Sequence, residues 1–493
     1  MQPYYSRPRV RASTKVSRPV AKWPFILALT RKTLFSRPLL SLWFTCSGSG
    51  RHFMSHTAQL PSQSSAAAIG RASAPLWSVL LFTFINSYAS GTMFSGLFFV
   101  LEKAYGFSAL DNCLIGLVFG ITYIIGAVGA GPITRALGQR GLSPRGLIVV
   151  LMILAAGLNL LPVLAWYGVE PAARSGMVWM MWLFSGLYSA LCGVLWPVVE
   201  SFLAGGRTAK QLRHAMGKFN VTWSSALVGS LLVLAMFAAE HKMAAFGLVA
   251  LVHLLSIGVL MFWPARAGEH PHEQHETPPV YAQLLTVHRV LLPLTYVVLY
   301  AIGPLLPSIT RQVGVSARWQ EVVASVWLAA RVVAFLTMGL WHGWHGQWST
   351  PKVGMSLLLG GFAAAVLAPA LAPAAADGVT NAIGGSPVGL SVFLAGLVAI
   401  GLGAAAIYSA SLYYAMEVGS SGVDAGGTHE AMIGLGYTVG PICGILPLAA
   451  VNAGWLGIAA GTPVTVGLTS LVVAGGIAHA FRTARATTRQ RPN

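Results

Sequence analysis

The sequence predicts an all-α membrane protein with about twelve membrane-spanning helices, arranged as two six-helix bundles related by pseudo-symmetry. Three observations predict this fold class. Of the 493 residues, 55% are hydrophobic and only 9% are charged, and the mean hydropathy is +0.68. A soluble domain of this size needs far more charge to cover its surface. The apolar residues also form continuous runs of about 20, which matches the thickness of a bilayer core, and a short motif recurs in the second half of the chain.

Twelve apolar runs are long enough to span a membrane. They lie near 76–101, 110–131, 146–166, 176–200, 216–238, 244–263, 287–309, 320–341, 353–373, 387–415, 431–452 and 456–480. Gly and Pro are frequent within them, as is typical of closely packed membrane helices. Strands are not expected, because no alternating ten-residue pattern occurs and an open sheet edge is not tolerated in lipid.

Basic residues concentrate in the even-numbered loops and at the C-terminus. Spans two and three, and spans four and five, are joined by loops that contain Arg135, Arg140, Arg145, Arg207, Lys210 and Arg213. The odd-numbered loops carry few basic residues or none. By the positive-inside rule both termini face the cytoplasm, which agrees with an even number of spans in a bacterial-type inner membrane. The net charge of +18 therefore requires no nucleic-acid partner.

Polar segments divide the chain into five parts. Two bundles, 71–264 and 287–481, are joined by a cytoplasmic linker at 265–286, and a basic cytoplasmic tail follows at 482–493. Residues 1–70 form a basic arm, for which no fold is predicted, with ten of the 31 basic residues and no acid. This arm has three interpretations: a segment that contacts anionic membrane lipid, a transit peptide, or an untranslated stretch before a true start at Met54.

Motifs for metals, cofactors and enzymes are absent. The four cysteines (Cys46, Cys113, Cys192 and Cys443) are scattered, which indicates neither a disulfide framework nor a zinc site. No G-x-x-x-x-G-K-[ST] loop occurs, so ATP-driven transport is not supported, and no H-E-x-x-H or G-x-S-x-G element indicates a hydrolase. We expect a protein that is not an enzyme and has no cofactor or metal.

An internal repeat links the two halves. Gly131, six residues, Gly138 and Gln139 follow span two, and Gly339, six residues, Gly346 and Gln347 follow span eight in the same pattern. Glu200 and Glu417 end spans four and ten. Gly217 follows Glu200 at the same spacing at which Gly434 follows Glu417. Two six-helix halves in parallel repeat are the architecture of secondary transporters that rock around a central site.

Because of this repeat and the motifs described next, residues 76–481 resemble the major facilitator superfamily. Its cytoplasmic motif, G-x-x-x-D-R-x-G-R-R, is similar to the stretch with Gly131, Gly138 and Arg140, but Arg135 stands where the family has an acid that helps to latch the halves together. GYTVGPICG in span eleven has the G-x-x-x-G-P-x-x-G form that drug–proton antiporters carry in span five. No branch of the superfamily is identified.

We interpret the four glycines of the repeated turns (Gly131, Gly138, Gly339 and Gly346) as a gate hinge. They would let spans two and three, and spans eight and nine, close tightly at the cytoplasmic side.

Ionisable residues within spans are candidates for function, because their burial in hydrocarbon is costly. Arg331 lies near the middle of span eight, and its repeat partner is Tyr123 in span two. Arg331 either meets an anionic group of a solute in a central cavity or forms a structural pair with a carboxylate or helix-end carbonyls.

Three glutamates are candidates for a gate or for ion coupling. Glu200 and Glu417 either carry protons or pair with arginines such as Arg140 and Arg207 to hold the gate shut, and their symmetric positions at helix ends favour the gate. Glu430 precedes span eleven, where a cap in the first helical turn is the simpler interpretation. Among polar residues within spans, Asn86 and Asn220 either bind solute or hydrogen-bond between helices.

We therefore expect a secondary active transporter that moves a small solute by alternating access. An anionic solute is one option, raised by Arg331. Coupling to H⁺ or Na⁺, and function as a single chain, are implied by the resemblance alone. The alternative from another class is a membrane sensor or binding protein that kept the fold without transport, for which the altered latch at Arg135 is the best support.

Overall fold

The computed structural model describes residues 73–238, 241–268, 278–371, 387–418 and 423–489. All of them belong to one compact part of the chain, Ser62–Asn493, and the other part, Met1–Pro61, lies outside the described residues. The interpretations of the basic arm, including a start at Met54, and of much of the linker therefore concern parts of the chain outside the described residues.

Twelve helices in the described ranges are long and apolar enough to cross a membrane, which agrees with the twelve predicted spans. The spans of the first half consist of α4 (Leu76–Gly91) with η1 (Thr92–Gly96) and α5 (Leu97–Tyr105), α6 (Ala109–Gln139), α7 (Pro144–Tyr167), η2 (Pro171–Met177) with α8 (Val178–Ala204), α9 (Ala209–Met236), and α10 (Ala244–Val259) with η4 (Leu260–Phe262). Those of the second half consist of α11 (Pro279–Ile302) with η5 (Gly303–Leu305) and α12 (Leu306–Gln312), α13 (Gln320–Ala324) with α14 (Val326–Leu340), α15 (Ser349–Leu367) with η6 (Ala368–Leu371), α16 (Pro387–Val418), α17 (Val423–Asn452) and α18 (Ile458–Arg489).

Local sequence signals set several helix starts. The hydroxyl of Ser108 accepts a hydrogen bond from the backbone N–H of Asp111, whose carboxylate accepts one from the backbone N–H of Ser108, so a capping box begins α6. Thr208 and Gln211 form the same arrangement at the start of α9. Pro144 occupies the first turn of α7, where its missing N–H costs nothing.

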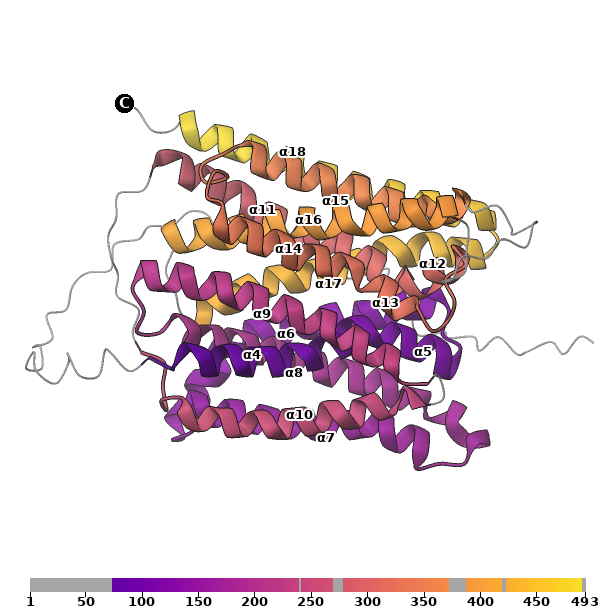
Figure 1. Ribbon diagram of the computed structural model, residues 1–493, viewed down its shortest axis with the longest axis horizontal. Coiled ribbons are helices and arrows are strands. Elements are labelled where there is room, and N and C mark those ends of the chain that lie inside the picture. The colour runs from indigo at the N-terminus through magenta and orange to yellow at the C-terminus, as the bar shows by residue number, and fades with distance from the viewer. Residues whose placement is uncertain (1–72, 239–240, 269–277, 372–386, 419–422, 490–493) are drawn as a thin grey trace, which may run out of the picture. The chain divides into compact units, whose positions relative to one another are not determined.

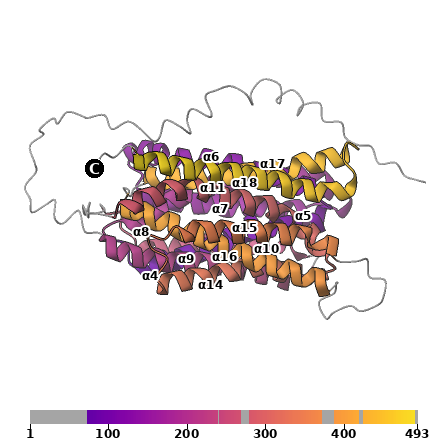
Figure 2. The ribbon, with the colours of Figure 1, turned by 90° about the horizontal axis from the view of Figure 1, so that it is seen from above.

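The helix contacts repeat in the two halves. In the first half α4 packs on α9, α6 on α8, and α7 on α8 and α10; in the second half α11 packs on α17, α14 on α16, and α15 on α16 and α18. Each contact thus has a counterpart six spans later, which agrees with the predicted pair of six-helix bundles. The first-half helices lie in the lower part of Figure 1 and the second-half helices in the upper part, and the long helices run roughly parallel in both views (Figure 1 and Figure 2).

The halves meet along α6 and α17, where small residues let the backbones approach closely. A Cβ added at Gly120 would collide with Thr438, and one at Gly434 would lie 2.8 Å from the Ile124 side chain. Between membrane helices such close packing replaces the hydrophobic effect as the source of association. The antiporter-like motif has a similar role, because its Gly440 packs against the backbone of α11.

The predicted tight closure of spans two and three, and of spans eight and nine, is wrong. α6 packs mainly against α8 and α17, and α14 mainly against α16 and α9. Gly138 and Gly339 have no atom within 4 Å of an added Cβ, so close packing does not require glycine there. Glycine is required at Gly346, where φ is +70°. The short joining turns therefore connect consecutive spans that pack against other helices.

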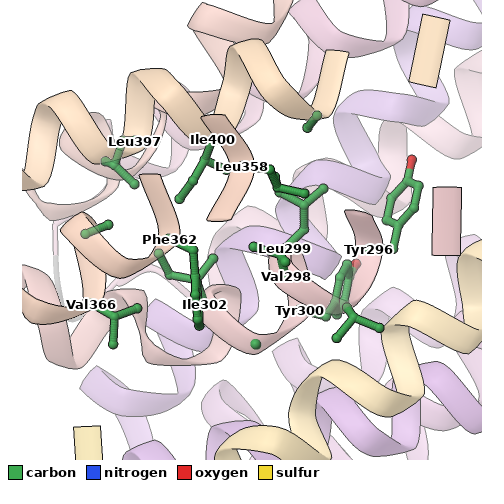
Figure 3. Packing of buried hydrophobic residues seen from close by; sticks show 14 of the residues in the cluster. Tyr296, Val298, Leu299, Tyr300, Ile302, Leu358, Phe362, Val366, Leu397 and Ile400 are labelled. Atoms are coloured by element: carbon green, nitrogen blue, oxygen red, sulfur yellow. The ribbon is translucent and has the colours of Figure 1, made fainter. Parts of the chain in front are cut away.

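The largest core cluster lies in the second half. Aromatic and branched side chains of α11, α15 and α16 fill it, and ten of them are labelled in Figure 3: Tyr296, Val298, Leu299, Tyr300, Ile302, Leu358, Phe362, Val366, Leu397 and Ile400. The span that begins with α11 is the most enclosed of the twelve candidate spans, because 89% of its most apolar 18-residue stretch is buried inside the protein. Tyr296 and Tyr300 of this buried helix continue from the core into the space between the halves.

Candidate functional site

A central cavity of about 120 Å³ lies between the halves. Thirteen residues of the first half line it: Ser87, Ser90, Phe94, Ser95, Phe98, Phe99, Tyr123, Trp196, Glu200, Phe219, Trp223, Leu227 and Leu231. Eleven residues of the second half complete it: Tyr296, Leu299, Tyr300, Gly303, Leu306, Trp327, Arg331, Tyr408, Glu430, Ile433 and Tyr437. Both halves therefore contribute to the lining, and the cavity lies between them.

The helices that frame the cavity are irregular beside it. The first span contains a π-helical turn at Thr92–Gly96, and the seventh span contains a 3₁₀ turn at Gly303–Leu305. These two spans are repeat partners. Single π-helical turns are rare and occur mostly at functional sites, and broken helices beside the binding site are typical of secondary transporters.

Arg331 reaches the cavity from α14 and is buried, with 3% of its surface exposed. Its Nε donates a hydrogen bond to the Ser224 hydroxyl at 3.0 Å. The guanidinium carbon lies 4.3 Å from the ring centre of Trp223 and 4.8 Å from that of Trp327. Nη2 is buried without a hydrogen-bond partner, and within the described residues no carboxylate pairs with Arg331. The structural pair that was one interpretation of this residue is not present there.

Two glutamates meet at the cavity from opposite halves. Donor atoms of Glu200, His429 and Glu430 lie within 4.8 Å of one another, and among the described residues they form a set close enough to hold one cation. Glu430 also accepts a hydrogen bond from the hydroxyl of Tyr123. The cap interpretation of Glu430 is wrong, because α17 begins at Val423 and Glu430 lies two turns inside it with 6% of its surface exposed.

A second, open space lies beside the cavity, at the end of the bundle where α9 begins and α16 ends. We call this the basic end. This cleft, of about 960 Å³, lies between α9 of the first half and α14 and α16 of the second, with Arg213, His214, Lys218, Asn220, His342, His345 and Glu417 among its lining residues. Burial lowers the pKa of His345 to about 4, so its imidazole is neutral near pH 7.

Three aromatic rings separate the cleft from the central cavity. Trp223 lies 5.8 Å from Phe335 and 5.5 Å from Tyr408, and Phe335 lies 5.8 Å from Tyr408, between ring centres. Trp223 and Tyr408 line the cavity, whereas Phe335 lines the cleft. We call these three residues the aromatic plug. Since Trp223 also packs on Arg331, the plug contacts the charged group of the cavity directly.

Two ion pairs join the halves at the basic end. Arg135 of α6 binds Asp424 of α17 at 2.7 Å, and Arg213 of α9 binds Glu417 of α16 at 2.6 Å. Arg135, which replaces the acid of the family motif, therefore still links the halves. Gly131 faces the same carboxylate, and a Cβ there would collide with Asp424. Glu417 pairs with a basic residue as the gate interpretation required, but its partner is neither Arg140 nor Arg207.

Ion pairs also join the halves at the opposite end of the bundle. Glu321 of α13 is fully buried and accepts hydrogen bonds from Lys103 at 2.9 Å and Lys242 at 2.6 Å. Glu102 pairs with Arg311 nearby. Burial lowers the pKa of Lys242, while the Glu321 carboxylate raises it. Sequence reasoning missed this layer, although acids at span ends in a chain with only 13 acidic residues were an available signal.

The remaining candidates lie away from the central cavity. Asn86 is buried between α4 and α10, where its side-chain oxygen lies 2.9 Å from Nδ1 of His253. Asn220 lines the cleft and accepts a hydrogen bond from the indole N–H of Trp223 at 3.3 Å. Arg140 is exposed and follows the last residue of α6 as its C-cap. Arg207 donates hydrogen bonds to backbone carbonyls, including that of Ala74.

Comparison with solved structures places the fold among transporters. The chain is similar to a mutant of the nucleoside transporter NupG (12% identity, TM-score 0.55, 83% of this chain and 99% of that chain) and to the human organic anion transporter MFSD10 (15%, 0.54, 83% and 98%). It is also similar to a bacterial homolog of the human lysosomal transporter Spinster in an inward-facing, unoccupied conformation (13%, 0.55, 88% and 100%). No family model and no curated protein matches the sequence. The protein therefore has the fold of the major facilitator superfamily, as the repeated motifs predicted, with no branch assigned.

Proposed function

We propose that the protein is a secondary active transporter that moves a small solute across a membrane by alternating access. The observation that carries this proposal is the central cavity, which both halves line and which lies between two separate layers of ion pairs. A rocking motion that breaks one layer while the other persists would expose the cavity to one side at a time.

In this proposal each layer of ion pairs closes its own end of the cavity. Arg135–Asp424, Arg213–Glu417 and the aromatic plug form the gate at the basic end, and Lys103, Lys242 and Glu321 form the gate at the other end. The basic end faces the cytoplasm of an inner membrane in this proposal, in agreement with the positive-inside rule. Residues 71–264 and 287–481 are the two moving bundles, 265–286 links them, 482–493 is a cytoplasmic tail, and a single chain is the working unit.

Arg331 supports an anionic solute. A buried guanidinium with an unpaired Nη2 loses hydration without gaining an acceptor, which is costly inside a membrane. An anionic group in the cavity would supply both the missing acceptor and the missing charge. Tyr123 and Glu430 complete the polar lining at the α6–α17 interface.

Glu200 and Glu430 support coupling to protons. Two adjacent carboxylates in a buried site cannot both ionise without strong repulsion, so the pair retains a proton until that site opens to solvent. Release of this proton would accompany the opening of the basic end. A Na⁺ ion at Glu200, His429 and Glu430 is the competing coupling ion.

A solute-exchange experiment tests transport while the solute is still unidentified. Proteoliposomes are loaded with a defined mixture of anionic, cationic and neutral metabolites, and mass spectrometry follows what each vesicle preparation loses. We expect selective loss of one solute class. The matched control is the same protein with both ends locked by a short thiol-reactive bifunctional cross-linker, at Arg135→Cys with Asp424→Cys and at Lys103→Cys with Ala317→Cys. The linker replaces the length of the Arg135 and Lys103 side chains, which reach these partners at 2.7 Å and 3.0 Å.

The sensor alternative makes the opposite prediction in the same experiment. A sensor binds a solute but releases none from the vesicles beyond the locked control. Its main support was the altered latch at Arg135, and the ion pair of Arg135 with Asp424 now supplies a link between the halves at that position. The described residues therefore favour the transporter.

A further inference from the structure

We infer that the solute is a monocarboxylate carried on a single planar aromatic ring. The inference rests on the proposed transport function and on four features of the cavity: an unpaired guanidinium, a single positive charge, a wall of aromatic side chains and a small volume.

The guanidinium of Arg331 fixes where the carboxylate binds. Its Nε is held by Ser224, and the indole rings of Trp223 and Trp327 lie 4.3 Å and 4.8 Å from its central carbon. The edge that carries Nη2 is buried and has no hydrogen-bond partner within the described residues. Because Nε is already bound, Nη2 is the nitrogen that lacks an acceptor, and a carboxylate binds a guanidinium nitrogen in the plane of that group.

The charges of the lining select one negative group. Arg331 is the sole Lys or Arg among the 24 described residues that line the cavity, whereas Glu200 and Glu430 are both there. A second carboxylate or a phosphate dianion would lack a cationic partner in a low-dielectric site and would be repelled by any ionised glutamate. A monoanion leaves the site close to neutral.

The wall of the cavity selects a flat ring. Twelve of the 24 lining residues are aromatic, although aromatic residues make up 10% of the chain. Tyr300 and Tyr437 stack at 3.7 Å with an interplanar angle of 24°, and Phe94 lies 5.8 Å from Tyr437. Aromatic faces and edges pack best against another planar ring. The volume of about 120 Å³ is of the same order as the roughly 150 Å³ cavity that accommodates benzene, so a solute with a second ring would not fit.

The cleft at the basic end suits the approach of such an anion. The basic residues Arg213 and Lys218 and the acidic residue Glu417 line this cleft. His345 adds no charge near neutral pH, because burial lowers its pKa to about 4. A basic cleft with low-dielectric walls raises the local concentration of anions. The cleft ends at the aromatic plug, which contacts Arg331 through Trp223.

Binding of four small probes to the purified full-length protein tests the inference by isothermal titration calorimetry. Benzoate carries a planar ring and one charge. Cyclohexanecarboxylate removes planarity, benzamide removes the charge and phthalate adds a second carboxylate. We expect benzoate to bind at least about 10-fold more tightly than each of the other three, a difference of roughly 1.4 kcal/mol.

Variants assign the binding to the cavity. Arg331→Gln should abolish benzoate binding, and Arg482→Gln, which removes an exposed arginine of α18, should leave it unchanged. Arg331→Gln changes a buried side chain and can therefore also impair folding. Tyr437→Leu and Tyr437→Phe provide a second test that does not depend on this variant. Tyr437→Leu should weaken benzoate about 10-fold but leave cyclohexanecarboxylate within about 2-fold, whereas Tyr437→Phe keeps the ring and the benzoate affinity.

Two outcomes would overturn the inference. One is equal or tighter binding of cyclohexanecarboxylate, benzamide or phthalate, and the other is no heat from any carboxylate with protein that remains folded by circular dichroism. Failure of the transport proposal is distinguishable from both. Selective loss of a cationic or neutral solute from proteoliposomes would retain transport and reject the aromatic anion, whereas benzoate binding without flux would retain the ligand class and reject transport.

Discussion

The carboxylates of Glu200 and Glu430 lie within 4.8 Å of each other, on α8 of the first half and α17 of the second. The repeat that relates Glu200 to Glu417 also relates Arg213 to Glu430, and Arg213 and Glu417 form an ion pair at 2.6 Å. The two contacts are thus equivalent by pseudo-symmetry, yet one joins opposite charges and the other joins two acids. Two adjacent carboxylates repel each other when both are ionised, so in the proposed transport cycle only the acid pair closes with a proton.

Replacement of one acid should therefore uncouple transport from protons. In Glu430→Gln the carboxamide preserves the shape of the side chain but cannot release a proton. We expect accumulation driven by a pH gradient to fall at least about 10-fold, while exchange of solute down its own gradient continues. Uptake into proteoliposomes with and without an imposed pH gradient measures both. Glu170→Gln, which alters an exposed acid before η2, is the matched control, and undiminished pH-driven accumulation by Glu430→Gln would contradict the coupling role.

The two gates should differ in their contribution to stability. Glu321→Gln leaves Lys242, whose side chain is only 5% exposed, without its carboxylate partner, and removal of one partner from a buried pair costs about 3 kcal/mol or more. Arg135→Gln should cost less than about 1 kcal/mol, because Arg135 and Asp424 are 60% and 69% exposed. Thermal unfolding of both variants in detergent provides the comparison. Similar losses of unfolding free energy in the two variants would show that the burial of an ion pair does not determine its contribution to stability here.

The aromatic plug should control access from the basic end. Phe335→Ala removes the ring that lies between the cleft and the cavity, so a membrane-impermeant maleimide applied from the basic end should label Ser87→Cys several-fold faster in a background without the native cysteines. Val333→Ala, at a position on the same helix that is 58% exposed, should not change the labelling rate. An unchanged rate in Phe335→Ala would mean that another group blocks the path.

Close contact between α6 and α17 should be necessary for closure of the basic end. In Gly120→Ala the added methyl group would meet the Thr438 backbone and force the two helices apart. Cross-linking of Arg135→Cys to Asp424→Cys by a short thiol-reactive bifunctional reagent should slow markedly in this background. Gly138→Ala tests the specificity of the effect, because no atom lies within 4 Å of its added Cβ. Equal cross-linking rates in both variants would show that close contact between α6 and α17 is not necessary for closure of the basic end.

Much of the fold was predictable because it depends on local properties of the chain. A run of about 20 apolar residues identifies a span wherever it occurs, and the recurring turns and the matched glutamates at the ends of spans four and ten reveal the two halves. The central position of Arg331 was predictable as well, since a charge in the middle of a span is tolerated only where it faces protein or a water-filled space.

Partners across the halves were not predictable. The sequence singled out Glu200, Glu417 and Arg135, but their neighbours depend on the rotation and register of helices that are far apart along the chain. In membrane helices the lipid-facing and protein-facing sides are both apolar, so hydrophobic periodicity does not report which side faces inward. Glu430 is an example. The sequence predicted that it caps a helix, but α17 begins at Val423, so Glu430 lies within the helix and lines the cavity.

The twelve spans, the two halves and a cation at the centre all follow from the amino-acid sequence, since length, hydropathy and repetition are written along the chain. The tertiary structure was needed to show that Glu200 meets Glu430, that Arg135 meets Asp424, and that Glu321 holds two lysines. Close packing of small residues sets these pairings. A backbone approach made possible by Gly120 and Gly434 determines which side chains can reach each other.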